Sequence, residues 1–329
     1  MSVVSHVGAT TDAKDGAGDK GLSGEYFAQG CGLTTEYKRS KNLQSLIHFS
    51  YTVPYLLLFL CWLVIPIIAG FLVSLTKWTF ISGKYQLVGL KNYVDAFADE
   101  LFLKGIQNTI YYTVMTVIGG NLFSFFLAYG LTRVQRFRNL FRKVFFIPLL
   151  LSVGITGIMW RWLYNTDFGL LNYYLGFFGL KNTNWLGDAR ISMPAVALMA
   201  IWGSCGFNML IYYAGIREIP TELKEAATID GAGGFYQLWS IILPLIRPKI
   251  LFCLVMSTIG SIQVFDRAYM LTGVGPYFAN YTAIFHIYYQ AFRYFRMGYA
   301  SACAFVLALL ILAFTSLLFR FLGKHEEYY

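Results

Sequence analysis

The sequence predicts an all-α integral membrane protein with six transmembrane helices. Of its 329 residues, 57% are hydrophobic and only 13% are charged, and the mean hydropathy is +0.54. Soluble globular chains usually carry about 25% charged residues. The apolar residues also come in long runs, and a helix of about 20 such residues crosses the roughly 30 Å hydrocarbon layer of a bilayer. The chain therefore has too little polar surface for a soluble protein.

Six segments are long and apolar enough to span a membrane. In order along the chain they are residues 52–74, 108–131, 144–163, 191–213, 249–271 and 298–321. Pro148 and Gly154 interrupt the third segment, although neighbouring helices can satisfy the backbone groups that such breaks release. We therefore expect a six-helix transmembrane domain over residues 47–329. Residues 1–46 are rich in Gly, Ser, Asp and Lys and lack an apolar signal-peptide core, which predicts a polar, disordered cytoplasmic tail.

Lysine and arginine at the ends of the spans set the predicted orientation, because cytoplasmic flanks carry an excess of these residues. The loop after the second span is the most basic, with Arg133, Arg136, Arg138, Arg142 and Lys143. Both termini, this loop and the loop after the fourth span are therefore predicted to be cytoplasmic. The net charge of +9 follows from this clustering and does not require a nucleic-acid partner.

Two of the predicted outer loops have content of their own. Residues 88–97 alternate apolar and polar residues at helical spacing, which predicts a helix lying along the membrane surface. Residues 169–186 include an apolar stretch, 170–180, that is too short to span. Both segments are more typical of packing against the outer leaflet than of a binding site.

Several function classes lack their signatures. The five cysteines include no C-x-x-C pair and the four histidines are scattered, so neither a disulfide framework nor a metal site is predicted. The sequence contains no phosphate-binding G-x-x-x-x-G-K-[ST] loop, and Gly231, Gly233 and Gly234 do not fit a dinucleotide fingerprint. A polytopic membrane enzyme would need paired carboxylates, spaced histidines or a Ser/His set at membrane depth, and none is found. We expect no cofactor bound by this chain.

The predicted cytoplasmic segment at about 217–248 has the features of a helix–turn–helix elbow. Pro220 suits a first helical turn, and Glu222 and Glu225 favour the positive N-terminal end of that helix. Gly231 can adopt the left-handed conformation that ends a helix. A second short helix is predicted from about 235 to 241, where Pro244 and Pro248 break it. Ala226 and Ala227 leave one face of the first helix without bulk, so that another protein surface can approach. An ordinary connector between spans is the plain alternative.

This elbow resembles the EAA signature of the permease subunits of binding-protein-dependent ABC importers. The resemblance lies in Glu225-Ala226-Ala227, then Gly231 after three residues, Ile241 after nine more and Leu243-Pro244 after another one. Other phrases resemble the MalF-like sugar branch, among them residues 184–188 (NWLGD) and 264–276 (VFDRAYMLTGVGP), where Val274 replaces a glycine common in relatives. The similarity covers about residues 50–322.

The resemblance implies a type I ABC importer permease in a bacterial inner membrane. Its partners would be a second permease in a heterodimer, two ATP-binding cassette subunits that use ATP and Mg, and an extracytoplasmic solute-binding protein. The residues that would couple this chain to the ATPase subunits are Glu222, Glu225, Ala226, Ala227, Asp230 and Gly231. The chain itself would have no catalytic residues.

Polar groups inside the spans mark the candidate substrate path, because burying them in hydrocarbon is costly. Asn208, Gln263 and Asp266 can bind hydroxyl groups, and Trp202 offers an aromatic face to a sugar ring. Serines and threonines carry less weight, since they bond to their own helix or to neighbouring helices. Asp266 and Arg267 also fit a role in orienting the helix at the interface. The favoured function is import of a sugar or oligosaccharide. The alternatives are an acidic oligosaccharide, a glycerophosphodiester or a polyamine.

Overall fold

The computed structural model describes residues 50–79, 83, 85–134 and 136–323. The predicted tail at residues 1–46 lies outside this range. The chain divides into two units, one up to Ile68 and one from Ala69 onward. The first candidate span, Ser50–Ser74, crosses this boundary as one helix. Its middle, Leu60–Val64, winds as a π-helix (η1), and α2 follows at Ile65–Ser74.

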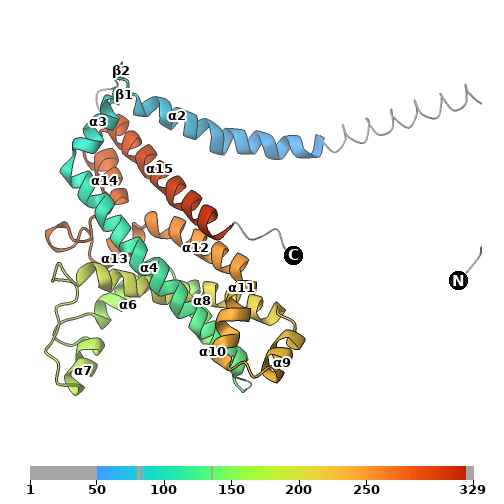
Figure 1. The fold of residues 1–329 in the computed structure, drawn as a ribbon. Coiled ribbons are helices and arrows are strands. Elements are labelled where there is room, and N and C mark those ends of the chain that lie inside the picture. Colours follow the sequence, from blue (N-terminus) through green and yellow to red (C-terminus); the bar gives the residue numbers. More distant parts are fainter. Residues whose placement is uncertain (1–49, 80–82, 84, 135, 324–329) are drawn as a thin grey trace, which may run out of the picture. The chain divides into compact units, whose positions relative to one another are not determined.

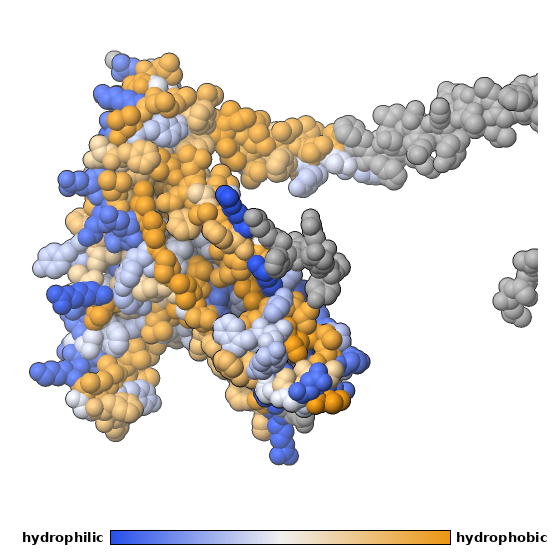
Figure 2. Space-filling view, viewed as in Figure 1, coloured by the Kyte–Doolittle hydropathy of each residue, from blue (hydrophilic) through white to orange (hydrophobic). Residues whose placement is uncertain are grey.

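Four long helices build the core of the second unit. They are α4 (Glu100–Arg133), α8 (Ser192–Glu218), α12 (Arg247–Ile262) and α15 (Met297–Leu322). α4 packs along α8 and also against α12, which in turn packs against α15 (Figure 1). Between the C-terminal halves of α4 and α8, Phe125, Met209 and Tyr212 belong to one buried cluster. Apolar side chains also cover much of the visible surface (Figure 2), as lipid-facing helices require.

The prediction of six spans is confirmed. Four helices are long and apolar enough to cross a membrane alone: Ser50–Ser74, α4, α8 and α15. Two further spans are bent pairs. In the first pair, α5 (Arg138–Leu150) and α6 (Val153–Leu163), the chain bends by 103° between the two helices. In the second pair, the helical segment Gly234–Leu245 and α12, it bends by 70°. Length and composition thus support six spans when each bent pair counts as one.

The third span breaks, but not at the residues expected to interrupt it. Pro148 lies in the last turn of α5, where helix geometry persists, and Gly154 lies within α6. The chain turns at Leu151 and Ser152, which are extended. The Ser152 hydroxyl then caps α6 by accepting a hydrogen bond from the Ile155 amide at 3.4 Å.

The expectation of one continuous fifth span over residues 249–271 is wrong. α12 ends at Ile262, and the separate helix α13 begins at Asp266 and ends at Leu271. At the break, the Val264 carbonyl accepts a hydrogen bond from the Thr282 hydroxyl, 18 residues further along the chain, at 3.1 Å. Gln263 is left as the C-terminal cap of α12.

Short elements gather at the end of the unit that the sequence predicts to be outer. A surface helix expected at 88–97 is present as α3 (Lys91–Ala98), and α7 (Leu170–Phe177) lies in the loop at 169–186. The sequence did not predict the antiparallel hairpin of β1 (Thr76–Trp78) and β2 (Tyr85–Leu87). It also did not predict the 3-10 turn η3 (Pro276–Phe278), or α14 (Ala283–Tyr288), which continues into the π-helix η4 (Tyr289–Arg293).

Asp99 joins three helices, α4, α14 and α15. Its carboxylate caps α4 by accepting hydrogen bonds from the amides of Leu101 at 2.9 Å and Phe102 at 3.1 Å. It also accepts one from the Tyr299 hydroxyl on α15 at 2.9 Å. His286 on α14 is fully buried and places its Nε2 3.6 Å from the same carboxylate. The beginnings of α4 and α15 are thereby fixed to each other.

Candidate coupling elbow and substrate path

The elbow begins where α8 leaves the helical core. Helical geometry ends at Glu218, and Ile219 and Pro220 are extended, so α9 (Thr221–Ile229) starts in a new direction. Lys224 ties α9 back to α8, because its ammonium group donates a hydrogen bond to the Ile216 carbonyl at 3.1 Å. Burial lowers the pKa of Lys224, and the charge of Arg217 lowers it further.

The turn after α9 is a left-handed helix cap built on Gly231. Its φ is +82°, a region in which residues with a Cβ are strained. The Ala232 amide donates to the Ala227 carbonyl at 2.8 Å, and the Gly231 amide donates to the Thr228 carbonyl at 3.1 Å. These two bonds are those of a Schellman motif. The left-handed turn that the sequence indicated at Gly231 is thus confirmed.

The second arm of the elbow folds back onto the first. α10 (Gly234–Gln237) continues as the π-helix η2 (Leu238–Ile242) and the short α11 (Leu243–Leu245). The side-chain Nε2 of Gln237 donates hydrogen bonds to the Thr228 hydroxyl and to the Ala232 carbonyl, both at 3.0 Å. These bonds hold the two arms of the elbow together.

The second arm breaks between the two prolines expected to break it, but it extends beyond the predicted end at 241. The segment runs on through Pro244, which lies in α11, the short continuation of η2. The bend lies at Ile246, between Pro244 and Pro248, and α12 begins at Arg247.

The predicted coupling residues lie on the elbow, with one facing inward. Glu222, Glu225, Ala226, Asp230 and Gly231 are exposed, whereas Ala227 is buried. The small side chain of Ala227 therefore serves packing within the chain. Ala226 remains as the small residue on the open face of α9.

Sequence reasoning missed an exposed apolar surface on the same elbow. It consists of Leu223, Ile229, Phe235, Tyr236 and Trp239, which are 47, 86, 75, 63 and 59% exposed. Exposed apolar groups gathered in one place commonly mark a surface that contacts another protein or a membrane. The sequence did carry a signal for this surface, because large apolar residues stand beside the glycine turn and a solvent-exposed turn is usually polar.

Asn208, a candidate substrate contact, is paired inside the helical core. It is buried, and its Nδ2 donates to the Ser257 hydroxyl on α12 at 3.1 Å and to Asn121 Oδ1 on α4 at 3.4 Å. The Tyr212 hydroxyl donates to the same oxygen of Asn121 at 2.7 Å. Polar bonds of this kind join helices within a membrane. This network therefore fastens α4, α8 and α12 to one another.

The other three path candidates lie nearer the predicted outer end. Gln263 is exposed at the end of α12, six residues beyond Ser257, or about 9 Å along a helix axis. Asp266 is exposed at the start of α13. Trp202 is half-buried and stands edge-on to Trp160, with ring centroids 5.7 Å apart. Trp202 packs against the same buried cluster as Phe265.

Comparison with known proteins decides the family. Residues 120–325 match the family model of the binding-protein-dependent transport system inner membrane component, a range that includes the elbow and the last span. The chain belongs to this family. In the part of this permease that the structure describes, no cluster of His, Cys, Asp and Glu is arranged to hold a metal ion.

Relatives cover nearly the whole permease. It is 34% identical over 293 residues to a probable ABC transporter permease protein of Bacillus subtilis, YurN, covering 87% of this chain and 99% of YurN. It is 32% identical to the arabinooligosaccharides transport system permease protein AraP of the same bacterium, over 84% of this chain and 89% of AraP. A chain of a bacterial ABC transporter involved in import of the acidic polysaccharide alginate shares the fold, with a TM-score of 0.76 at 22% identity, over 90% of this chain and 99% of that one.

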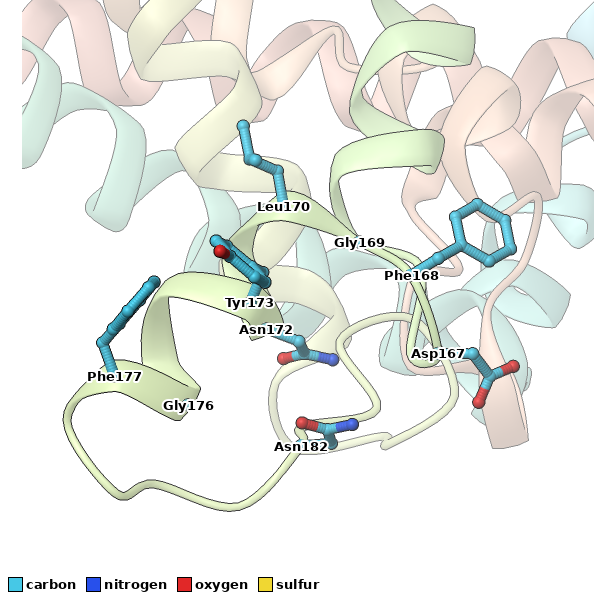
Figure 3. Close-up of a pocket in the computed structure, with 9 residues that line it drawn as sticks. All are labelled: Asp167, Phe168, Gly169, Leu170, Asn172, Tyr173, Gly176, Phe177 and Asn182. Carbon is cyan, nitrogen blue, oxygen red and sulfur yellow. The ribbon is translucent and has the colours of Figure 1, made fainter.

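The permease also carries an open cavity of about 690 Å³ beside α7. Tyr173 and Phe177 lie along the helix, and Asn182 lies on the segment that returns beneath it (Figure 3). Buried Asn172 shapes the cavity. Its Nδ2 donates to the carbonyls of Thr166 and Thr183, and its Oδ1 accepts from the Thr183 amide and Trp185 Nε1. Four bonds to one side chain give this loop a defined shape.

Proposed function

We propose that this permease is the transmembrane subunit of an ATP-driven ABC importer that carries a sugar or oligosaccharide. The observation that carries the proposal is the elbow at the end of α8, which combines a fixed Schellman turn with an exposed apolar surface. A connector with no partner would not keep Ile229 and Phe235 exposed to water. Movement of the elbow by an ATPase would be transmitted directly to α8, because Lys224 bonds to its last turn.

The proposed assembly contains four kinds of partner. A second permease forms a heterodimer with this chain, and two ATP-binding cassette subunits use ATP and Mg and receive the elbow through Glu222, Glu225, Ala226 and Asp230. An extracytoplasmic solute-binding protein delivers the solute. The family to which the chain belongs is defined by dependence on such a protein, which supports this partner. Membrane lipid surrounds the spans.

A sugar substrate is supported by the similarity to AraP, whose name specifies arabinooligosaccharides. Trp202, Gln263 and Asp266 supply the aromatic, amide and carboxylate groups that carbohydrate recognition uses. Asn208 has a structural role instead, because its side-chain amide bonds α8 to α4 and α12. The test is ATP-dependent uptake of a panel of labelled oligosaccharides by the reconstituted importer, with neutral sugars competing. Uptake of no neutral sugar would overturn the sugar assignment.

An acidic solute is the second candidate. The alginate importer that shares the fold handles an acidic polysaccharide. Arg267 lies beside Asp266 near the path and would meet an anion. A glycerophosphodiester fits the same group, whereas a polyamine would need Asp266 instead. Competition in the uptake panel by an acidic oligosaccharide alone would favour this candidate.

The proposed orientation places both termini and the elbow in the cytoplasm, with the bacterial inner membrane as the location. It is supported by the arginines at the end of α4, between α4 and α5, and in the first turns of α5, namely Arg133, Arg136, Arg138 and Arg142. In intact cells an impermeant thiol reagent should miss a single cysteine at position 225 and label one at position 182. The opposite labelling pattern would overturn this orientation.

A further inference from the structure

A second cavity lies between α5 and α8. It has a volume of about 320 Å³ and is lined by Asn139, Arg142, Lys143, Phe146 and Leu210. Two cationic groups and an amide thus meet above an aromatic and an aliphatic side chain. No aspartate or glutamate is among the residues that line the cavity.

Close packing of two helices creates this space. At Gly206 a Cβ would lie 2.2 Å from the Phe145 carbonyl oxygen, so only glycine lets α8 approach the α5 backbone this closely. Leu210 lies one turn farther along α8, and Phe146 is next to the point of contact on α5. The cavity therefore opens one turn from the crossing, on the side where the basic residues lie.

Among the described residues, Arg142 has an aromatic partner but no anionic one. Its side chain is half-buried, and its guanidinium lies over the Tyr213 ring, 5.0 Å from the centroid. Its Nε is buried without an acceptor, and no hydrogen bond or ion pair to Arg142 is found within the described part of the chain. A partly buried guanidinium normally has an anionic or carbonyl partner. An anion is the group missing from this cavity.

The surface beside the cavity shows what carries the anion. Asn139, Arg142, Lys143 and Phe146 recur at three- and four-residue spacing and so share one face of α5. Leu140, Val144 and Ile147 occupy the adjacent face and are 55, 49 and 52% exposed. A phosphate bound in the cavity would thus have an exposed apolar stripe next to it, along which the acyl chains of a lipid can lie.

We propose that this cavity binds the head group of an anionic phospholipid, with its phosphate between Arg142 and Lys143 and its acyl chains along the apolar face of α5. Basic pockets between transmembrane helices on the cytoplasmic side are suited to such head groups. Free phosphate shares the anionic chemistry but has no use for the apolar stripe. The site lies along the first turns of α5, before the bend at Leu151.

The test is a titration of the purified full-length chain with phosphatidylglycerol, and bound lipid is counted by native mass spectrometry. Phosphatidylcholine and inorganic phosphate are the comparison ligands. Arg142→Gln and Lys143→Gln should each weaken the apparent affinity for phosphatidylglycerol about fivefold, which corresponds to about 1 kcal/mol per cation. Arg136→Gln is the matched control, because it removes the same charge from the same basic segment outside the cavity, and it should change the affinity less than twofold.

Three results would overturn the proposal. Equal losses in Arg136→Gln and Arg142→Gln would show attraction to surface charge only. Equal binding of phosphatidylcholine would show that the anion is irrelevant. Displacement of the lipid by millimolar inorganic phosphate would show a site for a free anion. Lys143 is exposed, so Lys143→Gln keeps the test valid if Arg142→Gln alters folding, which circular dichroism checks.

Discussion

Asp99 is the polar residue with the widest structural reach at the predicted outer end of the permease. Burial raises the pKa of its carboxyl, but hydrogen bonds from the Phe102 amide and the Tyr299 hydroxyl outweigh burial, so the pKa lies below its ordinary value. A carboxyl whose pKa is lower in the folded state stabilises the fold above its unfolded pKa. That stabilisation is lost as the pH falls through the folded value.

Replacement of Asp99 by alanine should therefore lower the free energy of unfolding by about 1–2 kcal/mol at neutral pH, through loss of the helix cap. Asp95→Ala, at an exposed position on the neighbouring α3, is the control and should change it by less than about 0.5 kcal/mol. Thermal denaturation of the purified variants measures both. The difference between wild type and Asp99→Ala should shrink below about pH 4. A difference that stays constant down to pH 3 would contradict this role of the carboxylate.

Substitution of Asn208 and of Gln263 should have different effects, because the first amide is structural and the second is available to solute. Asn208→Leu removes donors to Asn121 and Ser257, so it should destabilise the purified importer by about 1–3 kcal/mol. Gln263→Leu, at an exposed position, should leave stability within about 0.5 kcal/mol and weaken the apparent affinity for transported solute. Thermal stability and uptake kinetics of each variant show whether its amide is structural or contacts the solute. Normal kinetics in Gln263→Leu would remove this residue from the path.

The elbow is the element whose function depends most on one backbone conformation. Gly231 and Gly233 are close in sequence, and in both cases a Cβ would meet open space. They differ in φ, which is +82° at Gly231 and −65° at Gly233. Substitution of alanine at each position therefore tests the left-handed turn without a steric clash.

Gly231→Ala should cost about 1 kcal/mol or more in the turn and reduce ATP-dependent uptake severalfold at a normal protein level. Gly233→Ala should keep uptake within twofold of wild type. Uptake per inserted permease is the measurement. Equal activity of the two variants would mean that coupling does not depend on the Schellman turn.

The elements show where sequence patterns suffice. Apolar runs predicted the single-helix spans because each is a helix long enough to cross the bilayer, and proline, acids and glycine predicted the elbow from local rules. The bend at Leu151 and the break at Gln263 were not predictable in this way. At the second of these, Val264 bonds to Thr282, which comes from a later segment of the chain. The pairing of Asn208 with Asn121 was hidden for the same reason.

At the scale of the whole molecule, the two functional regions are joined by α8. Its C-terminal end carries the elbow, and Lys224 of the elbow bonds to Ile216 there. Its middle is bonded to α4 and α12 through Asn208. Trp202 lies farther toward the predicted outer end. A displacement of the elbow would therefore move the helix that carries Trp202 and is bonded to α12, as alternating access requires.

The most direct test of this account is ATP-dependent solute uptake by proteoliposomes that contain the complete importer. Glu225→Lys reverses one exposed charge on the elbow, and Asp95→Lys makes the same kind of change on α3 as the matched control. The account predicts that Glu225→Lys abolishes uptake while the chain still inserts at a normal level, and that Asp95→Lys transports like wild type. Normal uptake by Glu225→Lys, or ATP hydrolysis by the purified permease alone, would contradict it.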